Sequence, residues 1–109
     1  MKKTGLYFKE KEILLSELIW QLQKDLRMSG INADLLQDVS REEDLIRRLM
    51  EIIENLLMYK PGLFHNLLYR IDIKEENLQV LAAENLQWEL AKMIIKREII
   101  KVYYRKKFG

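Results

Sequence analysis

Residues 40–57, SREEDLIRRLMEIIENLL, carry an apolar side chain at every third or fourth position. This spacing matches the 3.6-residue period of an α-helix and gathers one apolar stripe along it. The stripe holds Leu45, Ile46, Leu49, Ile52, Ile53, Leu56 and Leu57. Ser40 and Glu43 fit a capping box, in which the serine oxygen accepts the backbone N–H of the glutamate. We predict a helix that starts at Ser40 and ends at Lys60-Pro61-Gly62, because proline disfavours helical geometry in the residue before it.

A second helical pattern precedes this one, from about Tyr7 to Ser29. Its apolar side chains share one broad face, and Gly30 follows at the position where a residue free to adopt positive φ favours a helix end. The face holds Phe8, Leu15, Leu18, Ile19, Leu22 and Leu26. Within residues 31–39, Asn32-Ala33-Asp34 indicates a turn, and Leu35-Leu36 can form a single helical turn over the core.

The remaining patterns follow the proline. A short helix from about Gly62 to Arg70 has the length of a linking element. Asp72 and Glu75 fit another capping box, which predicts a helix start there. Nothing breaks a helix from that point to about Lys106, so we expect either one long helix or two that meet near Glu84-Asn85.

Length and composition define the fold class. The chain has 109 residues with one proline and four glycines, which suits one domain and favours helices over sheets. Amphipathic helices must bury their apolar stripes on one another. The sequence therefore predicts a single helical domain over residues 1–109, an all-α, small up-and-down bundle of three to four main helices plus a short linking helix.

The N-terminus and the cysteine count bear on location. The chain has no cysteine, which removes disulfides and thiolate metal sites. Residues 1–8 begin like a signal peptide, but the charged residues 9–12 cut the apolar run short. No stretch approaches the roughly 18 uncharged residues that a membrane-spanning helix requires. We expect a cytoplasmic protein that does not bind membranes.

Groups that could carry catalysis are sparse. His65 is the only histidine, and neither metal-ligand spacings nor a glycine-rich phosphate loop is present. A surface or boundary position for His65 is favoured over a general base. Glu98 lies at the edge of an apolar stripe, where a boundary ion pair with Arg70 or another basic residue is favoured over a catalytic pocket. We therefore expect no enzyme, no catalytic or metal-binding residues, no cofactor and no small-molecule substrate. A substantial pocket beside His65 or Glu98 would be needed to reverse that expectation.

The C-terminal helical pattern is apolar on two sides. One face, taken as the core face, holds Leu81, Trp88, Ala91, Ile95, Ile99 and Val102. A helix apolar on both sides is either central in its bundle or packed against another chain. Because few helices of so small a bundle can be surrounded, we favour packing against another chain. On the first helix, Ile13 and Trp20 also fall outside the core stripe, where aromatic anchors can mark a contact surface or lie under neighbouring segments. The predicted partner interface comprises Ile13, Trp20, Leu86, Leu90, Met93, Ile100 and Tyr104.

Charge is divided unevenly along the chain. Residues 92–109 hold seven basic side chains against Glu98 and sum to +6, so residues 1–91 sum to −4 within the net +2. The candidate phosphate-binding residues are Lys96, Arg97, Lys101, Arg105, Lys106 and Lys107. Nucleic-acid binding favours a continuous positive surface, and these side chains point in several directions around a helix. Basic residues also gather at helix C-termini to complement the helix dipole.

Two functions follow from these patterns. The first is a non-enzymatic protein–protein interaction or scaffold protein, a homodimer or the partner of another protein, which acts through the apolar outer face of the C-terminal helix. The alternative is a nucleic-acid-binding accessory protein that uses the basic segment 92–109.

Overall fold

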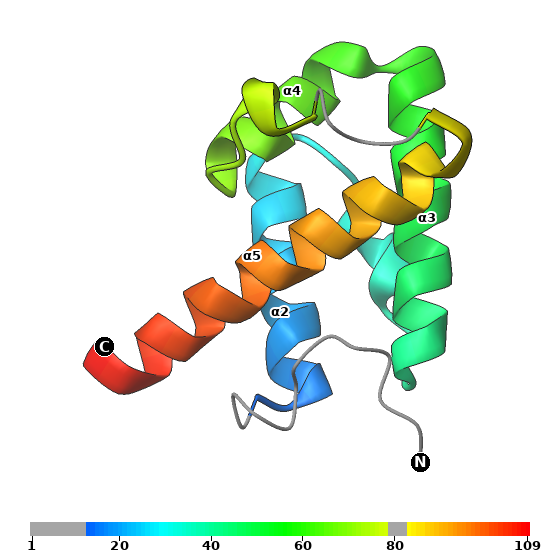
Figure 1. The fold of residues 1–109 in the computed structure, drawn as a ribbon. Coiled ribbons are helices and arrows are strands. Elements are labelled where there is room, and N and C mark those ends of the chain that lie inside the picture. Colours follow the sequence, from blue (N-terminus) through cyan, green and yellow to red (C-terminus); the bar gives the residue numbers. More distant parts are fainter. Residues whose placement is uncertain (1–12, 79–82) are drawn as a thin grey trace.

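The computed structural model describes residues 13–78 and 83–109, and it confirms the all-α fold (Figure 1). It has four described α-helices, which are α2 (Leu15–Met28), α3 (Glu42–Tyr59), α4 (Pro61–Arg70) and α5 (Leu86–Phe108). The 3₁₀ turns are η1 (Ala33–Leu36), between α2 and α3, and η2 (Glu75–Leu78) and η3 (Ala83–Asn85), between α4 and α5. The predicted bundle with a short linking helix is therefore present, with α4 as the linking helix.

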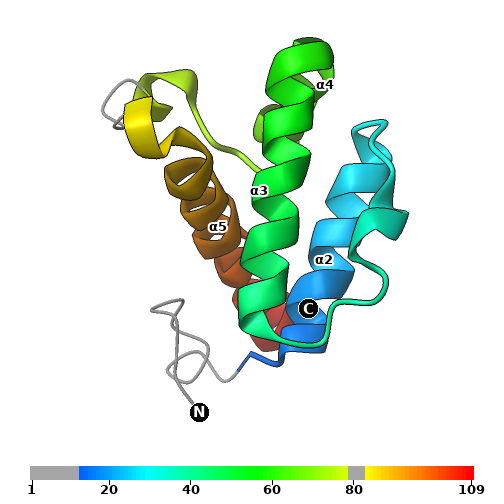
Figure 2. The ribbon, with the colours of Figure 1, turned by 90° about the vertical axis from the view of Figure 1, so that its right-hand side faces the viewer.

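The helices form two layers. Both views show α2 and α3 running in the same direction, because the segment that carries η1 returns to the opposite end of the bundle before α3 starts (Figures 1 and 2). η1 packs against both helices and fills the space between them. α5 crosses α2 and α3 obliquely, and its C-terminal end projects past α2 (Figure 1).

The core consists of leucine and isoleucine from every described helix and from η1. On α3, the predicted stripe is confirmed, with only Leu57 partly exposed. Complete burial of one such side chain contributes about 1.5–3 kcal/mol. The largest fully buried side chains are Leu18, Leu22, Leu26, Leu36, Leu45, Leu49, Ile53, Leu67, Ile71, Ile94, Ile95 and Ile99. Phe8 and Leu81, both predicted for the core, lie outside the described residues.

The start of α2 differs from the prediction. Ile13 and Leu14 precede the helix, so its start is Leu15, and residues 7–12 of the predicted helix lie outside the described residues. Leu14 has extended backbone geometry, and its N–H donates to Glu17 Oε1 at 2.9 Å. In a capping box, the glutamate side chain accepts this hydrogen bond from the N-cap residue. The bond marks Leu14 as the N-terminal boundary of α2. At the other end the predicted stop is confirmed, because Gly30 adopts a φ of +88°.

Both predicted serine and aspartate capping boxes are wrong. α3 begins at Glu42, and Arg41 occupies the N-cap without a capping bond from its side chain. Asp72 has a φ of +67° and its carboxylate pairs with Arg97 on α5 at 3.0 Å. The long-range ion pair has replaced the local cap. Residues 75–78 form the 3₁₀ turn η2, so α5 does not reach back to Lys74, and it starts directly after the expected junction at Glu84-Asn85.

Candidate functional site

A polar cluster is buried where α5 crosses α2. Asp25 on α2 and Glu98 on α5 are both buried, although each lies among apolar neighbours. Lys101 Nζ lies 2.8 Å from Asp25 Oδ2, and Arg70 Nε lies 3.4 Å from Asp25 Oδ1. Gln21 Nε2 donates to Asp25 Oδ2 at 3.2 Å. Asp25 therefore joins α2, α4 and α5 through charged and polar contacts.

The two carboxyl groups differ in charge. Burial and the neighbouring Asp25 raise the pKa of Glu98 to about 10, so this side chain is a neutral acid at physiological pH. Burial acts to raise the pKa of Asp25 as well, but the neighbouring Glu98, Lys101 and Gln21 side chains lower it below its usual value. Arg70, expected beside Glu98, binds Asp25 instead, and the basic group near Glu98 is Lys101, 3.9 Å from Oε1. The cluster links α2, α4 and α5 through Asp25, while both carboxyl oxygens of Glu98 are buried without a hydrogen-bond partner among the described residues.

Two residues of the predicted partner interface lie in the core. Ile13 is 4% exposed and Leu90 is 2% exposed, so the prediction that they face a partner is wrong. On a helical projection of α5, Leu90 lies outside the main core stripe, but its side of the helix is also buried. Arg97, on that side, donates to the carbonyl of Ile71 at 3.0 Å and pairs with Asp72, which holds the segment after α4 against α5.

The rest of the predicted face is divided. Leu86 and Met93 are partly exposed and pack against the core, and Ile100 is partly exposed. Tyr104 is 53% exposed at the C-terminal end of α5. The middle of the outer face of α5 therefore contributes to the bundle itself, and only its C-terminal end offers an exposed aromatic ring.

An aromatic–basic surface forms where the end of α5 meets α2. We use this name for Trp20, Lys24, Tyr104, Arg105 and Phe108. Trp20 is 48% exposed and Phe108 is 71% exposed. The Arg105 guanidinium carbon lies 4.8 Å from the centre of the Trp20 ring, with Lys24 Nζ at 5.4 Å. The rings of Tyr104 and Phe108 stack with centres 5.6 Å apart and planes inclined by 17°.

Most of the candidate phosphate-binding side chains have partners within the chain. Arg97 pairs with Asp72, Lys101 with Asp25, and Lys106 with Glu17 at 3.2 Å. Arg105 donates to Gln21 Oε1 while it covers Trp20, and Lys107 Nζ lies 5.9 Å from the Tyr103 ring. Lys96 is exposed on α5. The basic segment thus attaches α5 to α2 and to the loop after α4, which the linear sequence does not reveal.

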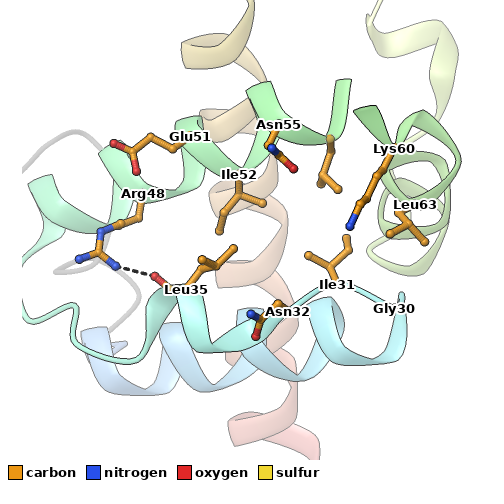
Figure 3. Close-up of a pocket in the computed structure, with 11 residues that line it drawn as sticks. Gly30, Ile31, Asn32, Leu35, Arg48, Glu51, Ile52, Asn55, Lys60 and Leu63 are labelled. Carbon is orange, nitrogen blue, oxygen red and sulfur yellow. Dashed lines mark hydrogen bonds between the residues drawn. The ribbon is translucent and has the colours of Figure 1, made fainter. Parts of the chain in front are cut away.

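A hollow of about 320 Å³ lies between η1 and α3 (Figure 3). Its apolar wall is formed by Ile31, Leu35, Ile52, Leu56 and Leu63. Polar groups stand at its edges. Arg48 donates to the carbonyl of Leu35 at 2.6 Å and pairs with Asp38 at 3.1 Å, and so holds η1 against α3. The Lys60 side chain extends into the hollow from the end of α3, with its nitrogen beside Ile31 (Figure 3).

Neither group that sequence analysis considered for catalysis lines this hollow, but His65 lines a second, more open hollow of about 420 Å³ with Leu68, Tyr69, Ile73, Lys74 and Glu76. His65 is exposed on α4, as predicted, and Glu98 is enclosed between helices. Among the described residues, no three His, Asp or Glu side chains gather in a way that could hold a metal ion. Within those same ranges, no helix combines the length and apolar character needed to cross a membrane.

No protein family, curated protein or solved structure matches this chain. Its function is therefore inferred from the geometry of its own side chains.

Sequence analysis missed two features, of which only the first, the buried Asp25, had a detectable signal. Asp25 lies three residues after Leu22 and seven after Leu18, at helical spacing from two core positions. A carboxylate there indicates a buried ion pair. The hollow had no comparable signal, because its residues come from the loop 30–32, η1, α3 and the start of α4, and only the folded chain brings them together.

Proposed function

We propose that this chain is a non-enzymatic interaction protein whose aromatic–basic surface binds another protein, with a second copy of the chain as the first candidate. The observation that carries the proposal is the exposure of Trp20, Tyr104 and Phe108 beside a bundle whose core is complete without them. Side chains of this size that add nothing to the core are typical of contact surfaces, where aromatic anchors supply much of the binding energy.

The geometry of Arg105 supports this role. Its guanidinium is held between Gln21 Oε1 and the Trp20 ring, so part of the surface is ordered before a partner arrives. Stacked Tyr104 and Phe108 restrict each other in the same way. Preordered side chains lose less conformational entropy on binding, which raises affinity for a given contact area. Tryptophan, tyrosine and arginine are also the residue types enriched at the centres of protein interfaces.

The charge distribution supports self-association. Residues 92–109 sum to +6 and residues 1–91 to −4, so these parts of two copies attract each other even though Arg97, Lys101 and Lys106 have ion-pair partners within the chain. A dimer in which each basic segment faces the partner's acidic part satisfies both charges and closes on itself. This arrangement predicts self-association that weakens as salt is added.

Size-exclusion chromatography with light scattering tests the proposal on the full chain. We expect a dimer that grows in population from micromolar to several hundred micromolar protein, and its loss in Trp20→Ala and Phe108→Ser. Tyr69→Ser is the matched control, because Tyr69 is an exposed aromatic residue on α4, outside the surface. A monomeric wild-type chain over that whole range would contradict self-association.

Nucleic-acid binding is the second candidate. It is favoured by one observation, the exposed stacked pair Tyr104 and Phe108 next to Arg105, since base stacking on aromatic side chains beside cations is how many single-strand binders work. The internal partners of Arg97, Lys101 and Lys106 weigh against it. Fluorescence anisotropy with mixed single-stranded DNA and RNA separates the two functions, because phosphate binding weakens steeply with salt and protein partners leave the oligonucleotides free.

A further inference from the structure

The hollow between η1 and α3 has the size and wall of a small-molecule site. Its volume of about 320 Å³ lies at the lower end of the range of roughly 300–1,000 Å³ for ligand pockets. Five aliphatic side chains form the wall, and α3 supplies two of them, Ile52 and Leu56, from its buried face. An apolar wall of this kind favours the hydrocarbon part of a ligand.

A cation stands at one end of this hollow. Lys60 terminates α3, and its side chain has no hydrogen bond or ion pair to any described residue. Its nitrogen lies over the apolar wall beside Ile31 (Figure 3). Lys60 is exposed, so an anion bound there would form one partly screened, charge-assisted contact with its amine.

At the end of the hollow opposite Lys60, the cation is already paired. Arg48 already contacts the Leu35 carbonyl and the Asp38 carboxylate, and Glu51 stands beside it on α3. The asymmetry gives the site a direction, with an anion-accepting end at Lys60 and an apolar length running toward Leu35. Asn55, between the two ends, offers an amide that can hydrogen-bond an oxygen of the ligand (Figure 3).

From this arrangement we propose that the hollow binds a small hydrophobic carboxylate, with the carboxylate on Lys60 and the hydrocarbon part on Ile31, Ile52 and Leu56. The volume equals that of about ten water molecules in the liquid, which limits the ligand to a medium-chain or single-ring acid. The site goes beyond the proposed interaction function and shares no residue with the aromatic–basic surface.

The test uses three ligands with one tail and different head groups: octanoate, octanamide and octylammonium. Each is titrated into the full chain, kept dilute enough to be monomeric, and followed by two-dimensional NMR of the backbone amides and methyl groups. We expect octanoate to shift signals of Ile31, Ile52 and Asn55, and to bind about five- to tenfold tighter than octanamide, as one charge-assisted contact allows. Octylammonium should bind more weakly than octanamide.

Two variants make the test specific. Lys60→Met keeps the length of the apolar stem and removes the charge, so octanoate and octanamide should bind equally to it. Lys74→Met is the matched control, because Lys74 is an exposed lysine that does not line this hollow, and it should leave the preference for octanoate unchanged. Leu35→Trp fills the hollow with a larger side chain and should weaken all three ligands.

Several results would overturn the site. The site would be rejected if millimolar octanoate did not shift the NMR signals of residues in the hollow. Equal affinity for octanoate and octylammonium would also reject it. A preference for octanoate that survives in Lys60→Met would contradict the role of the amine. Shifts confined to Trp20 and Phe108 would place the ligand on the aromatic–basic surface and reject the hollow, with no bearing on whether the chain self-associates.

Discussion

Asp25 on α2 and Glu98 on α5 form a buried carboxyl pair in which Asp25 is charged and Glu98 is neutral. Lys101 and Arg70 both contact Asp25, so the cluster carries a net charge of +1 when Glu98 is neutral. Two carboxylates this close cannot both ionise at low cost, so the retained proton lets the helices cross at this point. Lys101 and Arg105, on the same side of the crossing, join α5 to α2 through Asp25 and through Gln21 and Trp20.

The neutral state of Glu98 makes the stability of the fold depend on pH. Its pKa is about 10 in the folded chain against an ordinary 4.5, so between these values the folded state holds a proton that the unfolded state has lost. The contribution of Glu98 to the free energy of unfolding is fully present below pH 4.5. It falls as the pH rises toward 10, by at most about 1.4 kcal/mol per pH unit. Glu98→Gln cannot titrate and matches the neutral acid in size. In urea unfolding, the free energy of unfolding of Glu98→Gln should rise relative to that of the wild type as the pH increases. Parallel curves for the two chains would contradict a neutral Glu98.

Asp25 should be the more sensitive member of the pair. Asp25→Asn removes the anion that Lys101 and Arg70 share and leaves two cations at a buried site. Breaking such a pair on one side costs about 3–5 kcal/mol. The control is Asp38→Asn, which removes an exposed ion pair with Arg48 and should leave the unfolding midpoint nearly unchanged. Equal midpoints for the two variants would show that the buried cluster does not stabilise the helix crossing. Because the pKa of Asp25 is lowered, its own contribution is present above its ordinary pKa and is lost as the pH falls below it.

Truncation along α5 should separate core from surface. Leu90→Ala removes a fully enclosed side chain and should cost about 2–5 kcal/mol, as Ile95→Ala should. Tyr104→Ala removes an exposed ring and should cost little. Chemical denaturation of the three variants measures the difference. A small loss of unfolding free energy in Leu90→Ala would mean that Leu90 lies on the outer face of α5, as its position on a helical projection suggested.

The helical fold was predictable because its strongest signals are local. The apolar period of α3, the stop at Gly30 and the separation of α3 from α4 by Pro61 each depend on residues within a few turns of one another. The second capping box failed for the opposite reason. Asp72 contacts Arg97, 25 residues away, and that ion pair competes successfully with the cap.

The candidate surface was predictable only in part. Trp20 and Tyr104 were expected at an exposed face and are exposed, since their helical positions lie away from the core stripe. Leu90 was misplaced because its side of α5 is also buried in the fold, where Arg97 donates to the carbonyl of Ile71. The contact of Arg105 with Trp20 joins residues 85 positions apart, and no pattern in the sequence specifies that distance.

The chain's two tryptophans allow the most direct test of the aromatic–basic surface. Trp20 lies in that surface, whereas Trp88 packs partly buried near the start of α5. In an NMR dilution series, the indole N–H signal of Trp20 should move with protein concentration while that of Trp88 stays fixed, and Phe108→Ser should abolish the movement. A Trp20 signal that is constant from micromolar to several hundred micromolar protein, or a change centred on Trp88, would contradict self-association through this surface.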